Sequence, residues 1–281
     1  MSKIITFIGL GFVVASGAFA KKKPDYPRAD IKVEYNYHKE SMLNDGSVTE
    51  RNIPFILLFN KSQSKFYSPH TEWKDSLLST PSGRAKEKEI FRAAAAYSEN
   101  RDRRAMDGII YHSRLYVTKD FAKSASTVYD EAGMGELGYY SESFSEMTWE
   151  IGDSTKTILG YECVMAASDY HGRKWTVWFA SEIPVNDGPW KFCGLPGLIM
   201  EAAELSGQHS FIATGIESSN QPIYTIFSTE YEKMNRLDML KALRNHKDNG
   251  NFMIKASIGL DLGPDAPPQT EYDFLETDYR W

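Results

Sequence analysis

The chain has 281 residues and a formal charge of −6 at neutral pH, and hydrophobic residues make up 42% and aromatic residues 13% of it. This composition excludes a disordered protein and is enough for one large core or two modest ones. Charges of both signs are interleaved along the chain, so it has no basic stripe that would neutralise the phosphates of a nucleic acid.

Residues 1–20 have the pattern of a cleavable signal peptide. A positive start at Lys3 precedes an apolar run and a small-residue triplet at 18–20. The run is shorter than the roughly 18 to 20 residues that span a bilayer, so we expect cleavage after Ala20 rather than an uncleaved anchor. The sequence therefore predicts one exported, soluble domain over residues 21–281. We expect it in the periplasm; association with the outer membrane and full secretion are the alternatives.

The first elements of the mature chain are predicted from hydrophobic periodicity. Residues 31–38 alternate between apolar and polar side chains, which predicts a strand with one solvent-exposed face. The apolar run 53–59, a polar break and the segment 65–68 together predict a hairpin. The alanine-rich segment 85–97 predicts a helix with one apolar side, within a helical insertion at about 80–105.

The second half of the chain is mainly strand-like. Further strands are predicted at 108–117, 147–151, 156–168, 174–180, 209–216 and 222–227. The capping-box pattern from Thr229 to Glu232 predicts a second helix at about 229–246. Residues 260–281 are predicted to be a loosely held tail that could add one edge strand. The fold class is therefore mainly β, of the α+β type, with a curved antiparallel sheet or open barrel and about two helices.

Two cysteines, Cys163 and Cys193, lie in the exported part of the chain. An even number of cysteines in a compartment that permits oxidation predicts a disulfide between them. The bond would close a loop of about thirty residues and stabilise the fold by roughly 3 to 4 kcal/mol. The alternative is a pair of buried free thiols.

Local motifs for catalysis or cofactor binding are not found in the sequence. The six histidines have no metal-ligand spacing, no serine lies in a nucleophile elbow, and no glycine-rich phosphate loop is present. We therefore predict no metal and no cofactor, and a binding protein rather than an enzyme. An acidic pair that meets only in the fold, as in glycosidases, leaves no local pattern and stays open as an alternative.

The most specific motif lies between Trp190 and Ile199. Its centre, residues 195–198, is typical of a type II turn, in which proline presets the second position and glycine accepts the positive φ of the third. One interpretation is a structural turn that its leucines hold against the sheet. A second is an exposed apolar docking surface, and a third is a role in catalysis. The residues assigned to the motif are Trp190, Phe192, Gly194, Leu195, Pro196, Gly197, Leu198 and Ile199.

The block from about residue 149 to 216 resembles the GLPGLI family, exported proteins of Gram-negative bacteria named for the hexapeptide that stands here at Gly194–Ile199. The pieces G-Y-x-C, G-R-x-x-x-x-W-F and G-P-W-K-F carry the resemblance, whereas the segment 80–105 and the C-terminus depart from it. The resemblance implies export and, by analogy, an accessory role beside outer-membrane receptor systems. It implies no activity, ligand or catalytic residue. Both cysteines lie inside the family's central block, which favours the disulfide.

Three functions follow as hypotheses. The leading one is a non-enzymatic periplasmic binding or accessory protein that uses the loop 190–200 against an envelope protein. The second is a carrier that holds a lipid or lipoprotein acyl chain in an apolar cavity inside the sheet. The third is a hydrolase with two convergent carboxylates, one of which has a raised pKa.

Overall fold

The computed structural model describes residues 25–43, 46–100, 113–133, 136–258, 270–271 and 274–280. Within these residues, one large open sheet dominates the fold. Its described strand pairs are antiparallel except for the pair β12 and β6. The predicted mainly β fold with a curved antiparallel sheet is confirmed. No helix in the described part of the chain is long and apolar enough to cross a membrane.

The strands run in the order β12-β6-β5-β4-β3-β2-β1-β11-β10-β9-β8-β7, and β13 pairs with β1. Their bounds are β1 Ile31–Leu43, β2 Val48–Phe59, β3 Gln63–Tyr67, β4 Tyr116–Asp120, β5 Ala125–Gly133, β6 Glu136–Ser143, β7 Glu150–Ile158, β8 Tyr161–Tyr170, β9 Arg173–Ala180, β10 Leu198–Glu204, β11 His209–Ser218, β12 Glu232–Lys233 and β13 Thr270–Glu271. The helices are α1 Pro69–Leu78, α2 Pro81–Asn100 and α4 Arg236–Ile258, and the 3-10 turns are η1 Phe144–Glu146 and η2 Asp278–Arg280.

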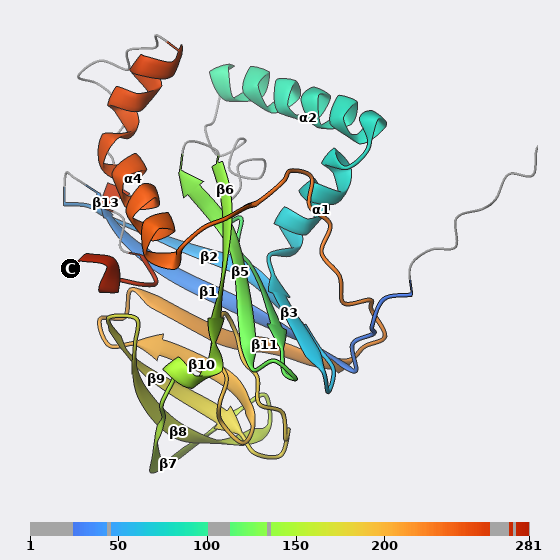
Figure 1. The fold of residues 1–281 in the computed structure, drawn as a ribbon, viewed down its shortest axis with the longest axis vertical. Helices are drawn as coiled ribbons and strands as arrows, with labels where there is room; N and C mark the ends of the chain where they lie inside the picture. Colours follow the sequence, from blue (N-terminus) through green and yellow to red (C-terminus); the bar gives the residue numbers. More distant parts are fainter. Residues whose placement is uncertain are drawn as a thin grey trace, which may run out of the picture.

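The sheet curls so that strands far apart in its order approach each other. Tyr170 on β8 donates a hydrogen bond of 2.8 Å to the Oε1 atom of Glu142 on β6. The three helices gather at one end of the molecule, and β7 to β10 form the opposite end (Figure 1). The curled sheet therefore has an inner side, and this side holds the core.

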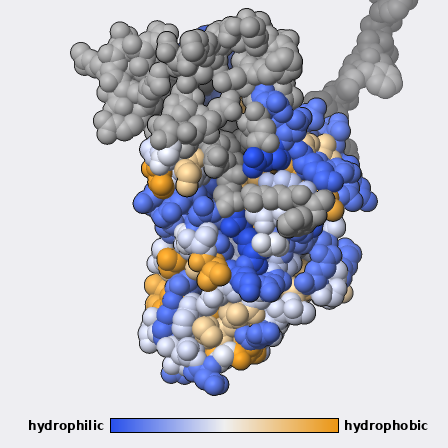
Figure 2. Space-filling view, turned by 90° about the vertical axis from the view of Figure 1, so that its left-hand side faces the viewer, coloured by the Kyte–Doolittle hydropathy of each residue, from blue (hydrophilic) through white to orange (hydrophobic). Residues whose placement is uncertain are grey.

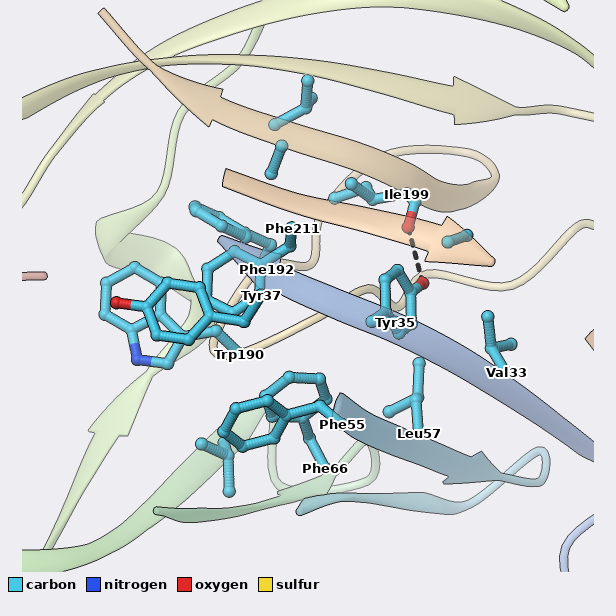
Figure 3. Packing of buried hydrophobic residues seen from close by; sticks show 14 of the residues in the cluster. Val33, Tyr35, Tyr37, Phe55, Leu57, Phe66, Trp190, Phe192, Ile199 and Phe211 are labelled. Carbon is cyan, nitrogen blue, oxygen red and sulfur yellow. Dashed lines mark hydrogen bonds between the residues drawn. The ribbon is translucent and has the colours of Figure 1, made fainter. Parts of the chain in front are cut away.

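Aromatic side chains fill the inner side of the sheet. Tyr37, Phe55 and Phe211 point inward from β1, β2 and β11, as the alternation predicted for the first strand requires. Trp190 and Phe192 reach the same cluster from the loop between β9 and β10 (Figure 3). A carrier would bind its ligand on this inner side, where the buried side chains of the core cluster lie.

The helices differ from the prediction in number and bounds. Three are described instead of about two, because α1 precedes the predicted alanine-rich helix, here α2. The predicted second helix begins at Arg236 rather than at 229. Asn235 caps it by accepting a hydrogen bond of 2.9 Å from the backbone N–H of Leu237, while residues 232–233 pair with β6. The helix also extends beyond its predicted end near 246 to Ile258, with a kink at Asn249, where φ is −113°.

Several strands also differ from the prediction. Residues 156–168 form parts of two strands, because Leu159 and Gly160 have φ values of 50° and 87° and make a two-residue turn. Residues 222–227 form no strand and contribute only an isolated bridge between Arg28 and Pro222. The first half of the predicted strand 108–117 lies outside the described residues, and β4 begins at Tyr116, near its end.

Candidate functional site

A buried ion pair attaches the loop between β9 and β10 to strand β4. Lys119 on β4 and Asp187 in the loop have fully buried side chains, and their Nζ and Oδ1 atoms lie 2.5 Å apart. The same ammonium group donates to the carbonyl oxygens of Gly188 at 2.8 Å and Phe192 at 2.9 Å. A buried pair needs such additional hydrogen bonds to offset its desolvation. The loop is therefore fixed in position at both Asp187 and Phe192.

The predicted motif belongs to this loop, and its apolar side chains are buried. Trp190, Phe192, Leu195, Leu198 and Ile199 each expose 2% or less of their surface. Only the glycine at 194 and the proline at 196 are exposed. The interpretation as an exposed apolar docking surface is therefore wrong, because these side chains form the core.

The turn in the motif also differs from the prediction. Gly197 does not have a positive φ, whereas Gly194 does, at 100°. A Cβ atom at Gly197 would lie 2.3 Å from the carbonyl oxygen of Ala180 on β9. The glycine at 197 is therefore required for close backbone packing and not for a type II turn.

Cys163 and Cys193 are both buried free thiols in the structure. Burial raises the pKa of Cys163 and raises the pKa of Cys193 to about 12, so little of either thiol is ionised at neutral pH. The disulfide between them stays a prediction for the oxidised protein.

A groove with a volume of about 410 Å³ lies where the loop meets the ends of the strands. We call it the aromatic groove. It is lined by Asp30, Ile31, Phe59, Asn60, Lys61, Phe121, Ser124, Phe144, Ile183, Pro184, Val185 and Asn186. Phe59 and Ile183 form a buried part of its wall, and the rings of Phe121 and Phe144 lie 6.2 Å apart between centroids. Its volume falls in the range of small-molecule sites.

Two polar residues of the aromatic groove are held in place by local hydrogen bonds. The side-chain oxygen of Asn60 accepts from the backbone N–H groups of Ser62 at 2.9 Å and Gln63 at 3.0 Å. The side-chain oxygen of Asn186 accepts from the N–H of Gly194. The groove is thus largely preformed, which reduces the entropy that binding would cost. Its residues come from five separate segments, so no local pattern in the sequence could have located it.

A buried charged cluster lies on the other side of the loop. The Nζ atom of Lys191 is 2.7 Å from a carboxylate oxygen of Glu142 and 2.7 Å from one of Glu276. The Nε2 atom of His171 lies 3.3 Å from Glu142, and its Nδ1 atom lies 3.1 Å from Asp278. No local pattern in the sequence indicates this cluster, because its members are brought together only by the curl of the sheet.

The cluster contains the convergent carboxylates that a hydrolase would need, but their charge state differs from the one expected. Burial favours the neutral form of Glu142, yet the hydrogen bond from His171 and the charge of Lys191 outweigh it and lower the pKa to about 2. A general acid needs a raised pKa instead. His171, Glu276 and Asp278 are also close enough to share one metal ion, but Lys191 and Arg236 already neutralise these carboxylates. The cluster is best described as an ion-pair network.

The end of the chain is part of this network. Phe274, Glu276 and Tyr279 are buried, and β13 pairs with β1. The expectation of a loosely held tail is therefore wrong for residues 274–280, because ion pairs and buried side chains hold them. The edge strand that the tail could add is observed as β13.

Comparison with known proteins matches part of the chain to a family. A family model described as a protein of unknown function (Porph_ging) matches residues 171–201, which include β9, the loop and its hexapeptide. The matched residues supply one wall of the aromatic groove. They also include two members of the charged cluster, His171 and Lys191. No curated protein matches the chain.

Two solved structures of the protein PNGF-II are similar to this chain. The form in space group P21 has a TM-score of 0.50 and 10% sequence identity, over 77% of this chain and 33% of PNGF-II. The form in space group C2 has a TM-score of 0.46 and 12% identity, with the same coverage. This chain thus spans about a third of the length of PNGF-II, and at such low identity the likeness shows the fold alone. The comparisons therefore place a segment typical of a family of unknown function inside a fold similar to part of PNGF-II.

Proposed function

We propose that this protein is an exported binding protein of the cell envelope, and that the aromatic groove is its ligand site. The observation that carries the proposal is the groove itself, which is preformed, about 410 Å³ in volume and mainly apolar. The signal-peptide pattern at residues 1–20 supports export. The buried state of the hexapeptide loop favours a scaffold role for the loop, since it supplies Ile183 to Asn186 to one wall.

The lining of the groove favours an amphipathic ligand. Three phenylalanine rings and the apolar side chains of the loop would bury an acyl chain or an aromatic group. Lys61, Asp30 and Asn60 lie at the same groove and would contact a polar head group. This assignment moves the carrier hypothesis from the interior of the sheet to the groove.

Titration with a dansyl-labelled undecanoic acid tests the proposal. We expect the wild-type protein to bind the probe and the double variant Phe121→Ala/Phe144→Ala to bind it at least tenfold more weakly, because two ring contacts are lost. Phe227→Ala, which truncates a ring outside the groove, is the matched control and should bind like the wild type. Equal affinity of all three folded proteins, or no binding to the wild type, would rule out this site.

A further inference from the structure

Residues 274–280 lie against the rest of the folded chain, here called the body, in the manner of a bound peptide. The carbonyl oxygen of Phe274 accepts hydrogen bonds from the Nε atom of Arg173 at 2.9 Å and from its Nη2 atom at 2.5 Å. Two residues later Glu276 contacts Lys191, and two residues after that Asp278 contacts Arg236 at 2.9 Å. Three residues at intervals of two thus meet a cation of the body, Phe274 through its backbone carbonyl and Glu276 and Asp278 through their carboxylates.

The body is shaped to accept the backbone of this segment. The N–H of Thr277 donates to the carbonyl oxygen of His171 at 2.9 Å, and its hydroxyl donates to that of Gly172 at 3.0 Å. A Cβ atom at Gly172 would lie 2.4 Å from the Thr277 hydroxyl and 2.9 Å from the N–H of Asp278. The turn between β8 and β9 therefore leaves room for the segment only because it carries no side chain at Gly172.

The positive charges of the body at this position favour an acidic ligand. Without residues 274–280, Lys191 would keep its contact with Glu142, whereas the contacts of Arg236 with Glu276 and Asp278 would be lost. The segment brings the carboxylates of Glu276 and Asp278 to these cations, and the hydroxyl of Tyr140 donates to Glu276 at 2.9 Å. Lys191 and Glu276 expose 1% and 4% of their side chains, so this ion pair is largely shielded from solvent.

We propose that the turn between β8 and β9, β6, Lys191 and the first turn of α4 form a binding site for an acidic peptide, and that the chain's own residues 274–280 fill this site. A partner for the site presents a segment with two carboxylates two residues apart, and it competes with the internal segment. Because the internal segment is covalently attached, its effective concentration is high and it acts as an autoinhibitor.

The test converts the internal segment into a separable peptide. A protease recognition sequence replaces residues 263–268, the folded protein is cut, and a fluorescein-labelled peptide of residues 270–281 is titrated into cut and uncut protein. We expect the labelled peptide to exchange into the cut protein and to bind the uncut protein at least a hundredfold more weakly. The peptide with Glu276→Gln and Asp278→Asn should lose at least thirtyfold in affinity, whereas the charge-matched control with Glu271→Gln and Asp273→Asn should bind like the original.

Two further measurements keep the outcome decisive. In the cut protein, Arg236→Gln should weaken the labelled peptide, while Lys241→Gln on the same helix removes an equal charge and should leave the affinity unchanged. Circular dichroism follows the fold during exchange. If the cut segment leaves only when the sheet unfolds, or if cut and uncut protein bind the peptide equally, residues 274–280 are a permanent structural element and the proposal fails.

Discussion

At the scale of single residues, the close approach of the hexapeptide loop to β9 depends on a missing side chain. A Cβ atom at Gly197 would lie 2.3 Å from the oxygen and 2.6 Å from the carbon of the Ala180 carbonyl group. Both atoms belong to the backbone of a central strand and cannot move as the end of a flexible side chain could. Since Gly197 has no positive φ, the cost of a substitution there would be purely steric.

Gly197→Ala should therefore lower the free energy of unfolding by about 2 to 3 kcal/mol, as overpacking of a core does. Gly207→Ala is the matched control, because Gly207 has a φ of 82° and open space around it. That control should lose about 1 kcal/mol from backbone strain alone. Urea unfolding of both variants measures the difference, and equal losses would show that the loop can move away from β9.

The same residue shows how far the sequence could predict the site. The Pro-Gly pair correctly indicated that residue 197 must be a glycine. It indicated a positive φ as the cause, whereas the structure shows close packing against Ala180. The clash with Ala180 depends on the end of β9, which lies beside Gly197 in space but outside the sequence pattern around it. The aromatic groove and the charged cluster depend on the same kind of contact, because Phe59, Phe144 and Ile183 meet only after the sheet has curled.

At the scale of elements, prediction succeeded where burial has a simple period. The alternation at 31–38 is that of a strand with an apolar inner side, and β1 has this pattern in the structure. It failed for α1, whose buried residues Thr71, Lys74 and Asp75 are polar. The hydroxyl of Tyr116 donates to Asp75 at 2.8 Å, so this helix packs through polar contacts that leave no apolar stripe in the sequence.

The ion pairs of the buried charged cluster should make stability fall in acid. In the folded protein the pKa of Glu142 is lowered to about 2 from 4.5, and that of Asp278 is also lowered, because His171, Lys191 and Arg236 favour the ionised forms over the effect of burial. A depressed folded-state pKa contributes stability that is complete above the unfolded pKa and is lost as the pH falls through the folded one. We therefore expect the free energy of unfolding to decrease steadily from about pH 4.5 to pH 2.

The variant Glu142→Gln identifies the group responsible. It cannot ionise at residue 142, so its free energy of unfolding should be lower than that of the wild type at pH 6 and should approach the wild-type value near pH 2. Urea unfolding at a series of pH values supplies both curves. Parallel curves over this range would mean that Glu142 is not the residue through which acid destabilises the fold.

At the scale of the whole molecule, one native mass spectrum tests three expectations together. Protein purified from the periplasm without reductant or detergent should have the mass of residues 21–281. A loss of two hydrogens from this mass would establish the bond between Cys163 and Cys193. The full mass would instead indicate the buried free thiols of the structure, which maleimide should then label only after unfolding. Additional mass that disappears in Phe121→Ala/Phe144→Ala would be the ligand of the aromatic groove.

The position of β1 in the sheet also governs how the chain folds. Ile31 lies opposite Phe59 on one side and opposite Ser218 on the other, so the second partner strand follows the first by more than half of the chain. Pairing over such a distance in sequence slows folding. The chain is synthesised from its N-terminus, so one edge of β1 stays unpaired until β11 has been made. An unpaired strand edge is a site at which aggregation begins. The period during which the nascent protein needs protection is thus set by the separation of β1 and β11.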